Sequence, residues 1–174
     1  FDRLIASHVL EHIPDLVTFL VSAQRLLAPG GALALAVPDK RFCFDYSIPE
    51  TTIADVIEAF LQERRQHTFS NVVRHLALTT HNDPERHWNG DHFDAGYERN
   101  IANRVRQATG SYHHAGGAYI DVHAWQFTPT VFERLITNLA ELRYADFRAE
   151  LVNPTPWGRF EFTAILRKVE EANE

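Results

Sequence analysis

Three residues near the start of the chain combine types and a spacing that could hold a metal ion: His8, Glu11 and His12, which read HxxEH. As bare text this is a zinc-metalloprotease pattern, because ligands four residues apart share one face of a helix and the glutamate can serve as base. Pro14 follows shortly after His12, so the long helix that would carry those ligands is not predicted. We therefore predict no metal ion and expect Glu11 and His12 to hydrogen-bond locally and hold a turn.

A second set of chemically capable residues, Asp39, Lys40 and Arg41, follows the apolar run 32–37, with Tyr46 close behind. Asp39 could act as a general base on a hydroxyl group, and we carry it as a catalytic candidate. Lys40, Arg41 and Tyr46 could bind and orient a substrate. The alternative for all four is a capped and solvated turn.

The segment DVHAWQF offers a further pair, His123 and Trp125, whose alternation points both side chains to one side. They are candidates for a catalytic imidazole and a substrate-binding indole, and for Trp125 the alternative is packing in the core. The histidine-rich stretch 79–93 is typical of a surface loop that could cover a substrate. Its histidines follow no zinc spacing, and Cys43 is the single cysteine, so no metal site is predicted there.

The elements that must position these residues begin with a strand, a helix and a strand. The short apolar run 4–7 favours a strand buried on both faces. From Pro14 the apolar positions up to Leu27 recur at the spacing of one helix face, and 29–31 (Pro-Gly-Gly) ends that helix. The run 32–37 predicts a second strand. This order is a βαβ unit with parallel strands and a right-handed crossover.

The rest of the chain predicts helices and then an antiparallel hairpin. Thr52 and Asp55 resemble a capping box ahead of one helix, and further helices are expected around 72–78 and 97–110. Thr128 caps another helix with Pro129 in its first turn. Strands are expected over 147–152 and 160–167. The predicted fold class is therefore α/β, a parallel βαβ unit with a helical insert and a C-terminal antiparallel hairpin.

Composition excludes several classes of protein. The chain has 174 residues, 45% of them hydrophobic, and a formal net charge of −6. That charge argues against a nucleic-acid partner, and no apolar run approaches the roughly 20 residues of a membrane helix. A single cysteine and no basic-then-apolar leader lead us to expect a cytoplasmic protein.

Three strings in order resemble a known family: FDRLIASHVLEHIPD, then LLAPGG, then ALALAVPDKR. They are similar to the second half of class I S-adenosylmethionine-dependent methyltransferases of the small-molecule kind (type 11-like). The resemblance implies a partial Rossmann-like fold in which these strings are the fourth strand, the following helix and the fifth strand. The C-terminal hairpin resembles the sixth and seventh strands. The stretch YIDVHAWQFTPTVFERLI resembles a recurring segment of one bacterial branch.

The resemblance also implies a cofactor and its contacts. S-adenosylmethionine is the expected methyl donor, and Ser7, His8 and Val9, in the turn after the fourth strand, are the expected contacts. The family's glycine-rich loop and acidic ribose-binding residue are expected before Phe1, since neither is in this sequence. No methionine is present either, so we interpret the chain as the C-terminal part of one domain: 1–40 core, 41–127 substrate insert, 128–174 helix and hairpin. On this interpretation the fragment itself is inactive, and the strand at 4–7 has an exposed edge.

A similar turn in small-RNA 3′-terminal methyltransferases reads ExxEH and holds magnesium. Here His8 stands in place of the first glutamate, and hard cations prefer oxygen ligands, so no magnesium site is predicted.

Three function hypotheses follow from the residues and the resemblance. The first is transfer of a methyl group to a small-molecule acceptor, such as a sugar or metabolite oxygen, by the full-length protein. The second is a non-catalytic methyltransferase-like binding module, and the third is a metal-dependent hydrolase. The oligomeric state stays open.

Overall fold

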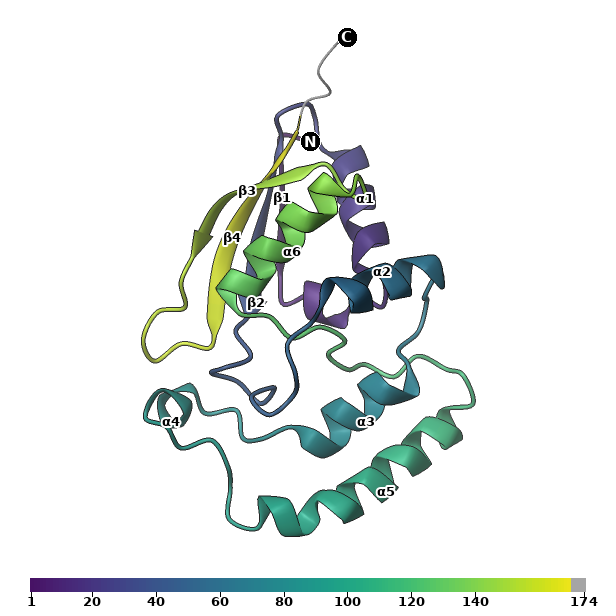
Figure 1. Cartoon of the computed structure of the whole chain (residues 1–174). Coiled ribbons are helices and arrows are strands. Elements are labelled where there is room, and N and C mark those ends of the chain that lie inside the picture. The colour runs from purple at the N-terminus through teal and green to yellow at the C-terminus, as the bar shows by residue number, and fades with distance from the viewer. Residues whose placement is uncertain (170–174) are drawn as a thin grey trace.

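The computed structural model describes residues 1–169 and shows a four-stranded sheet with helices packed on one face and a helical insert beyond one end (Figure 1). The last predicted segment, 128–174, therefore reaches past the described residues. The elements are β1 (Arg3–Ser7), η1, a single 3₁₀ turn (Leu10–His12), α1 (Leu16–Leu26), β2 (Ala32–Pro38), α2 (Ile53–Leu61), α3 (Phe69–Leu78), α4 (Pro84–Trp88), α5 (Tyr97–Ala115), α6 (Pro129–Glu141), β3 (Phe147–Asn153) and β4 (Glu161–Lys168). None of the helices within 1–169 is long and apolar enough to cross a membrane.

The sheet is mixed, with the strand order β1-β2-β4-β3. β1 and β2 are parallel and joined through α1, with Ser7 opposite Ala36. β4 pairs antiparallel with both β2 and β3. The predicted parallel pair and the predicted C-terminal hairpin are both confirmed. This arrangement of mixed α/β structure is compatible with a methyltransferase-like fold.

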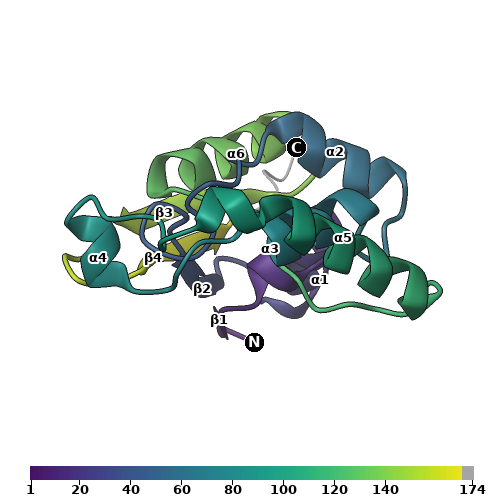
Figure 2. The same ribbon diagram turned by 90° about the horizontal axis from the view of Figure 1, so that it is seen from below.

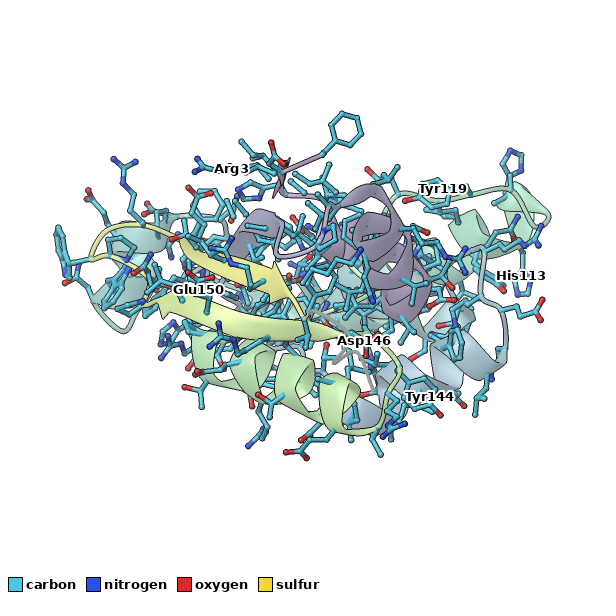
Figure 3. All side chains as sticks on the ribbon, turned by 90° about the horizontal axis from the view of Figure 1, so that it is seen from above. Arg3, His113, Tyr119, Tyr144, Asp146 and Glu150 are labelled. Carbon is cyan, nitrogen blue, oxygen red and sulfur yellow. The ribbon has the colours of Figure 1, made fainter. Side chains whose placement is uncertain are left out.

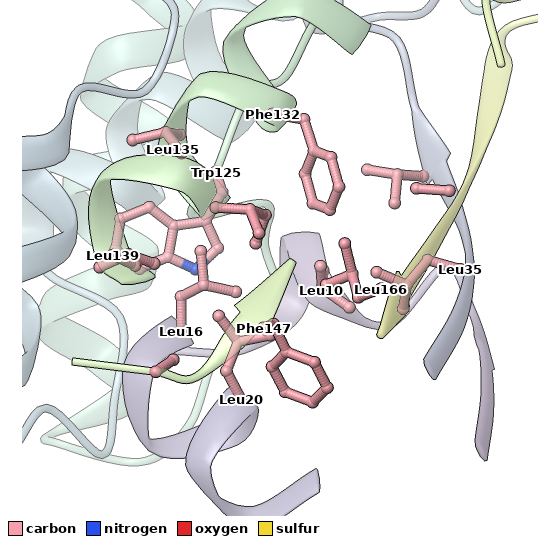
Figure 4. Packing of buried hydrophobic residues seen from close by; sticks show 14 of the residues in the cluster. Leu10, Leu16, Leu20, Leu35, Trp125, Phe132, Leu135, Leu139, Phe147 and Leu166 are labelled. Carbon is pink, nitrogen blue, oxygen red and sulfur yellow. The ribbon is translucent and has the colours of Figure 1, made fainter. Parts of the chain in front are cut away.

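The core lies between one face of the sheet and helices α1, α2 and α6 (Figure 4). Alternate residues of β4, namely Phe162, Ala164 and Leu166, are fully buried, because successive side chains of a strand point to opposite faces. Phe132 of α6 packs edge-to-face on Phe162 at 5.5 Å between ring centroids. The buried residues of α6 match the periodicity that predicted them, whereas Leu26, Leu61 and Leu142, at the C-terminal ends of their helices, were predicted on the buried faces and are exposed.

The edge strand β1 is less buried than predicted. β1 was predicted to be buried on both faces, yet Ile5 is 82% exposed while Leu4 and Ala6 pack against the core. The prediction is wrong because, within the described residues, β1 is an edge strand and no helix covers its second face. The expectation of an exposed edge at 4–7 is confirmed.

Local capping chemistry sets where the helices begin. Asp15 caps α1, accepting from the backbone N–H of Thr18 at 2.9 Å, so Pro14 precedes the cap instead of lying in the first turn. The capping box of Thr52 and Asp55 at α2 is confirmed. In the predicted loop 79–93 a short helix, α4, forms because Asp83 caps it and Pro84 occupies its first turn.

The insert spans α2 to α5; α2 packs beside α1, and α3, α4 and α5 lie beyond the carboxyl ends of β1 and β2 (Figure 1). α3 and α5 pack side by side, as the view from below also shows (Figure 2), and Phe69 meets Tyr112 edge-to-face at 5.2 Å. α5 was predicted to end at Gly110, but it continues to Ala115. It stops at Gly116, whose φ of 56° is left-handed. Helices were predicted between β2 and α6, and α2 to α5 confirm them.

Candidate functional site

The carboxyl ends of β1 and β2 lie side by side because the two strands are parallel and in register. The backbone N–H of His8 donates to the carbonyl of Ala36 at 3.0 Å, which fixes the chain as it leaves β1. His8 adopts a left-handed backbone conformation with φ of 53°, a geometry that non-glycine residues rarely adopt. Ser7 is exposed, and His8 and Val9 are partly exposed. The three expected cofactor contacts thus lie at the edge where open α/β sheets bind ligands.

Asp39, the predicted base, is fully buried at the end of β2. Its carboxylate accepts from the Arg41 guanidinium at 2.6 and 2.9 Å and from the Thr155 hydroxyl at 2.7 Å. The bond to Asp39 raises the pKa of Arg41. A carboxylate so fully paired ties the end of β2 to the connection between β3 and β4, and it is poorly placed to take a proton from a substrate.

Lys40 and Tyr46 are also occupied within the protein. The ammonium of Lys40 donates to the carbonyl of Tyr46 at 2.8 Å, and burial lowers the pKa of Lys40. The Tyr46 ring stacks on His92 with centroids 3.7 Å apart and planes 8° from parallel. These residues, predicted to bind substrate, therefore connect the segment after β2 to the insert.

Trp125 was predicted to bind substrate, with core packing as the alternative. Its side chain is only 2% exposed and lies in the core (Figure 4), and its indole N–H donates to the carbonyl of Ile13 at 2.6 Å. The alternation of DVHAWQF placed it on the same side as His123, but that side faces the turn after β1. This burial favours core packing, the alternative that the sequence left open for Trp125.

His123, the other predicted catalytic residue, lies in a cluster of residues that are far apart in the sequence. Its Nδ1 lies 2.6 Å from a carboxylate oxygen of Asp45, and its ring meets His12 edge-on at 4.7 Å. His12 in turn places Nδ1 2.8 Å from Asp121. Tyr119, labelled in Figure 3, donates its hydroxyl to the carbonyl of His12 at 3.2 Å and so anchors the same segment.

Glu11 lies in the middle of this cluster and is 1% exposed. Neither of its carboxylate oxygens has a hydrogen-bond partner among residues 1–169, so its expected local hydrogen bond is absent. Its nearest charged or chargeable neighbours are His8 Nδ1 at 3.4 Å and His12 Nε2 at 3.8 Å. The backbone holds the arrangement in place, because the N–H of Ala124 donates to the carbonyl of Glu11 at 2.6 Å.

The histidines of the insert, His81, His87 and His92, are arranged differently. His87 Nε2 bonds to the carbonyl of His81 at 3.0 Å, and His81 Nε2 bonds to the carbonyl of Asp91 at 2.9 Å. Burial lowers the pKa of both His87 and His92. Their ring nitrogens thus serve the loop's own backbone and each other.

Sequence reasoning missed three members of the site: Asp45, His75 and Asp121. His75 Nδ1 accepts from the backbone N–H of His123 at 3.1 Å, and burial lowers its pKa to about 4. Of these three, only Asp121 could have been connected to His123 from the sequence. It stands two residues before His123, and alternation places both side chains on one side. Asp45 and His75 come from separate segments, and no local pattern connects them.

A polar cavity of about 320 Å³ lies between α2, α3 and residues 124–126. Its charged and amide lining includes Glu50, Asn71, Arg74 and Gln126. None of its lining residues comes from β1, β2 or the turns that directly follow these strands, so it is separate from the strand-end site.

The comparisons with known proteins address the first elements of the fold. Residues 1–35 match a family model described as a methyltransferase domain. No curated protein and no solved structure matches the chain. The matched residues cover β1, α1 and the first half of β2, the unit on which the resemblance rests. The resemblance is thereby confirmed over this unit, and the match supports a class I S-adenosylmethionine-dependent methyltransferase-like domain.

Proposed function

We propose that the protein transfers a methyl group from S-adenosylmethionine to an oxygen of a small-molecule acceptor. The observation that carries this proposal is the coincidence of the methyltransferase-domain match with the parallel β1–α1–β2 unit. The domain match by itself supports methyl transfer in general. The choice of donor follows the resemblance to class I methyltransferases.

The donor would bind at the carboxyl end of β1. Ser7, which is exposed, and His8 and Val9, which are partly exposed, lie there beside the end of β2. Ligands of open α/β sheets bind at this edge because the strand ends present unpaired backbone groups and loops. Glycine-rich and acidic elements outside these residues would complete the donor site, and the open edge of β1 is consistent with further strands beside it.

The acceptor would lie under the insert, which extends beyond the same strand ends (Figure 1). The acceptor oxygen forms a bond to the methyl carbon as the carbon–sulfur bond breaks, S-adenosylhomocysteine leaves, and the hydroxyl proton passes to solvent. Asp39 is paired with Arg41 and Thr155, so it is not free to act as a base. The reaction we propose therefore depends on holding donor and acceptor in line.

The test uses protein expressed from its complete reading frame. Incubation with methyl-labelled S-adenosylmethionine and a panel of sugars and small hydroxylated metabolites should transfer label to one acceptor class. Ser7→Leu should weaken transfer because it places a bulky side chain at the donor edge, whereas His113→Gln, on the exposed side of α5, should not. Saturable binding of a metabolite without transfer of label would contradict the proposal and favour the binding-module hypothesis.

A further inference from the structure

We propose that Glu11, His12 and His123 bind a divalent transition-metal ion. The proposal starts from Glu11, whose carboxylate is buried and has no hydrogen-bond partner on either oxygen among residues 1–169. Burying a carboxylate without partners is costly, and native proteins pair such groups or use them to coordinate metal ions. The ligand atoms of Glu11, His12 and His123 all lie within 4.8 Å of one another.

The protonation pattern of the two imidazoles fits this role. Asp121 lies 2.8 Å from Nδ1 of His12, and Asp45 lies 2.6 Å from Nδ1 of His123. An ionised carboxylate only accepts hydrogen bonds, so each Nδ1 carries the proton and each Nε2 keeps a free lone pair. His12 Nε2 faces Glu11 at 3.8 Å. A metal-binding histidine whose second nitrogen donates to a carboxylate is the usual arrangement at metal centres.

The polar groups next to the three proposed ligands hold these ligands in position. In a second set of potential ligands, Asp45, His75 and His123, Asp45 already bonds to the Nδ1 of His123. His75 uses its own Nδ1 to accept the backbone N–H of His123, which orients that residue. His8 stands at the rim with Nδ1 3.4 Å from Glu11, while its Nε2 bonds to Glu161.

The donor set selects the class of ion. Two imidazole nitrogens and one carboxylate oxygen suit zinc, manganese, iron or cobalt, whereas magnesium and calcium prefer oxygen ligands throughout. The ligands differ from those of the HxxEH pattern: His123 takes the place that His8 would hold in a helical site, since η1 spans only Leu10–His12. Three protein ligands leave a coordination position for water or an oxygen of a bound molecule. The site does not depend on methyl transfer.

Metal content and affinity test the proposal directly. The full chain is stripped with a chelator, dialysed against Zn²⁺ and analysed for bound metal, and affinities for Zn²⁺, Mn²⁺ and Mg²⁺ are measured by competition with a chromophoric chelator. We expect about one zinc ion per chain and far weaker magnesium binding. Glu11→Gln should abolish zinc retention, and Asp121→Asn should weaken zinc binding about 10- to 100-fold. His113→Gln, which removes an exposed histidine of α5, should bind as the wild type does.

Thermal unfolding separates metal binding from misfolding. In excess chelator, Glu11→Gln should melt at or above the wild-type temperature, because it removes a buried and unpaired charge. Added Zn²⁺ should raise the melting temperature of the wild type but not that of Glu11→Gln. Equal zinc affinity in the two proteins, or no metal retained by the wild type, would overturn the proposal.

Discussion

Two groups of histidines in this molecule have similar composition and different organisation. The Glu11 cluster combines His12 and His123 with Asp45, Asp121 and a buried carboxylate at the strand ends. The insert cluster combines His81, His87 and His92 with the ring of Tyr46, and two of its histidines bond through Nε2 to backbone carbonyls. Only in the Glu11 cluster does a second nitrogen remain available beside an unpaired charge.

The difference teaches that histidine density in a sequence is a poor guide to metal chemistry. The stretch 79–93 is the histidine-rich part of the sequence, yet its rings stack and hold a loop together. The Glu11 cluster draws its members from three separate segments, 11–12, 45 and 121–123, and only Glu11 and His12 are adjacent. What distinguishes a binding site is the partner of each ring nitrogen, which sequence spacing does not reveal.

Of the changes that compare the two clusters, His123→Ala in metal-free protein should lower the free energy of unfolding most. The change leaves Asp45 buried without its imidazole partner, and breaking a buried pair in this way costs about 3–5 kcal/mol. Urea unfolding monitored by circular dichroism measures the loss. His113→Ala on α5 is the control and should change stability little. A loss below about 1 kcal/mol, as for exposed ion pairs, would show that the Glu11 cluster is not a tightly organised buried network.

A smaller effect is expected from His92→Ala in the insert cluster. The ring stacks on Tyr46 at 3.7 Å, and its loss removes an aromatic contact worth about 0.5–1.5 kcal/mol. The same urea experiment applies. If this loss equalled that of His123→Ala, the two clusters would be energetically alike and the comparison would fail.

The smallest effect is expected from acidification acting on the histidines of the insert cluster. Because burial lowers the pKa of His87 and His92, the unfolded chain binds more protons than the fold just below the ordinary histidine pKa of about 6.5. The stability from these neutral rings is therefore complete above about pH 6.5 and declines as the pH falls below it. Hydrogen exchange over residues 80–94, corrected for intrinsic rates, should show weaker protection at about pH 5 than at about pH 7.

His87→Gln provides the matched control for that measurement. The glutamine amide can still donate to the carbonyl of His81, but it does not titrate. The pH dependence should therefore be reduced in this variant. An unchanged dependence would assign the effect to groups outside the insert cluster.

Much of the fold was predictable because it depends on neighbours in sequence. The β1–α1–β2 unit, the cap at Thr52 and the terminal hairpin all follow from periodicity and capping chemistry. The predicted helix ends were wrong at two places. Pro14 was predicted in the first turn of α1, but Asp15 caps the helix after it, and Gly110 was predicted as the end of α5, but the helix continues through it. Intrinsic helix preferences of single residues are weak compared with the packing of a long helix.

The candidate site was predictable only in part. Ser7, His8 and Val9 were placed at the strand end by the resemblance, and they lie there. The pairings of His123 with Asp45 and of His12 with Asp121 join residues 78 and 109 positions apart. No pattern within one element encodes such contacts. For the same reason the alternation that placed Trp125 beside His123 could not say that the Trp125 side chain is buried in the core.

The central claim is that the carboxyl edge of β1 and β2 binds the methyl donor. Calorimetric titration of S-adenosylhomocysteine into protein from the complete reading frame tests it most directly. We predict saturable binding that weakens in Ser7→Leu and is unchanged in His113→Gln. No saturable heat, or equal affinity in the wild type and Ser7→Leu, would contradict the account.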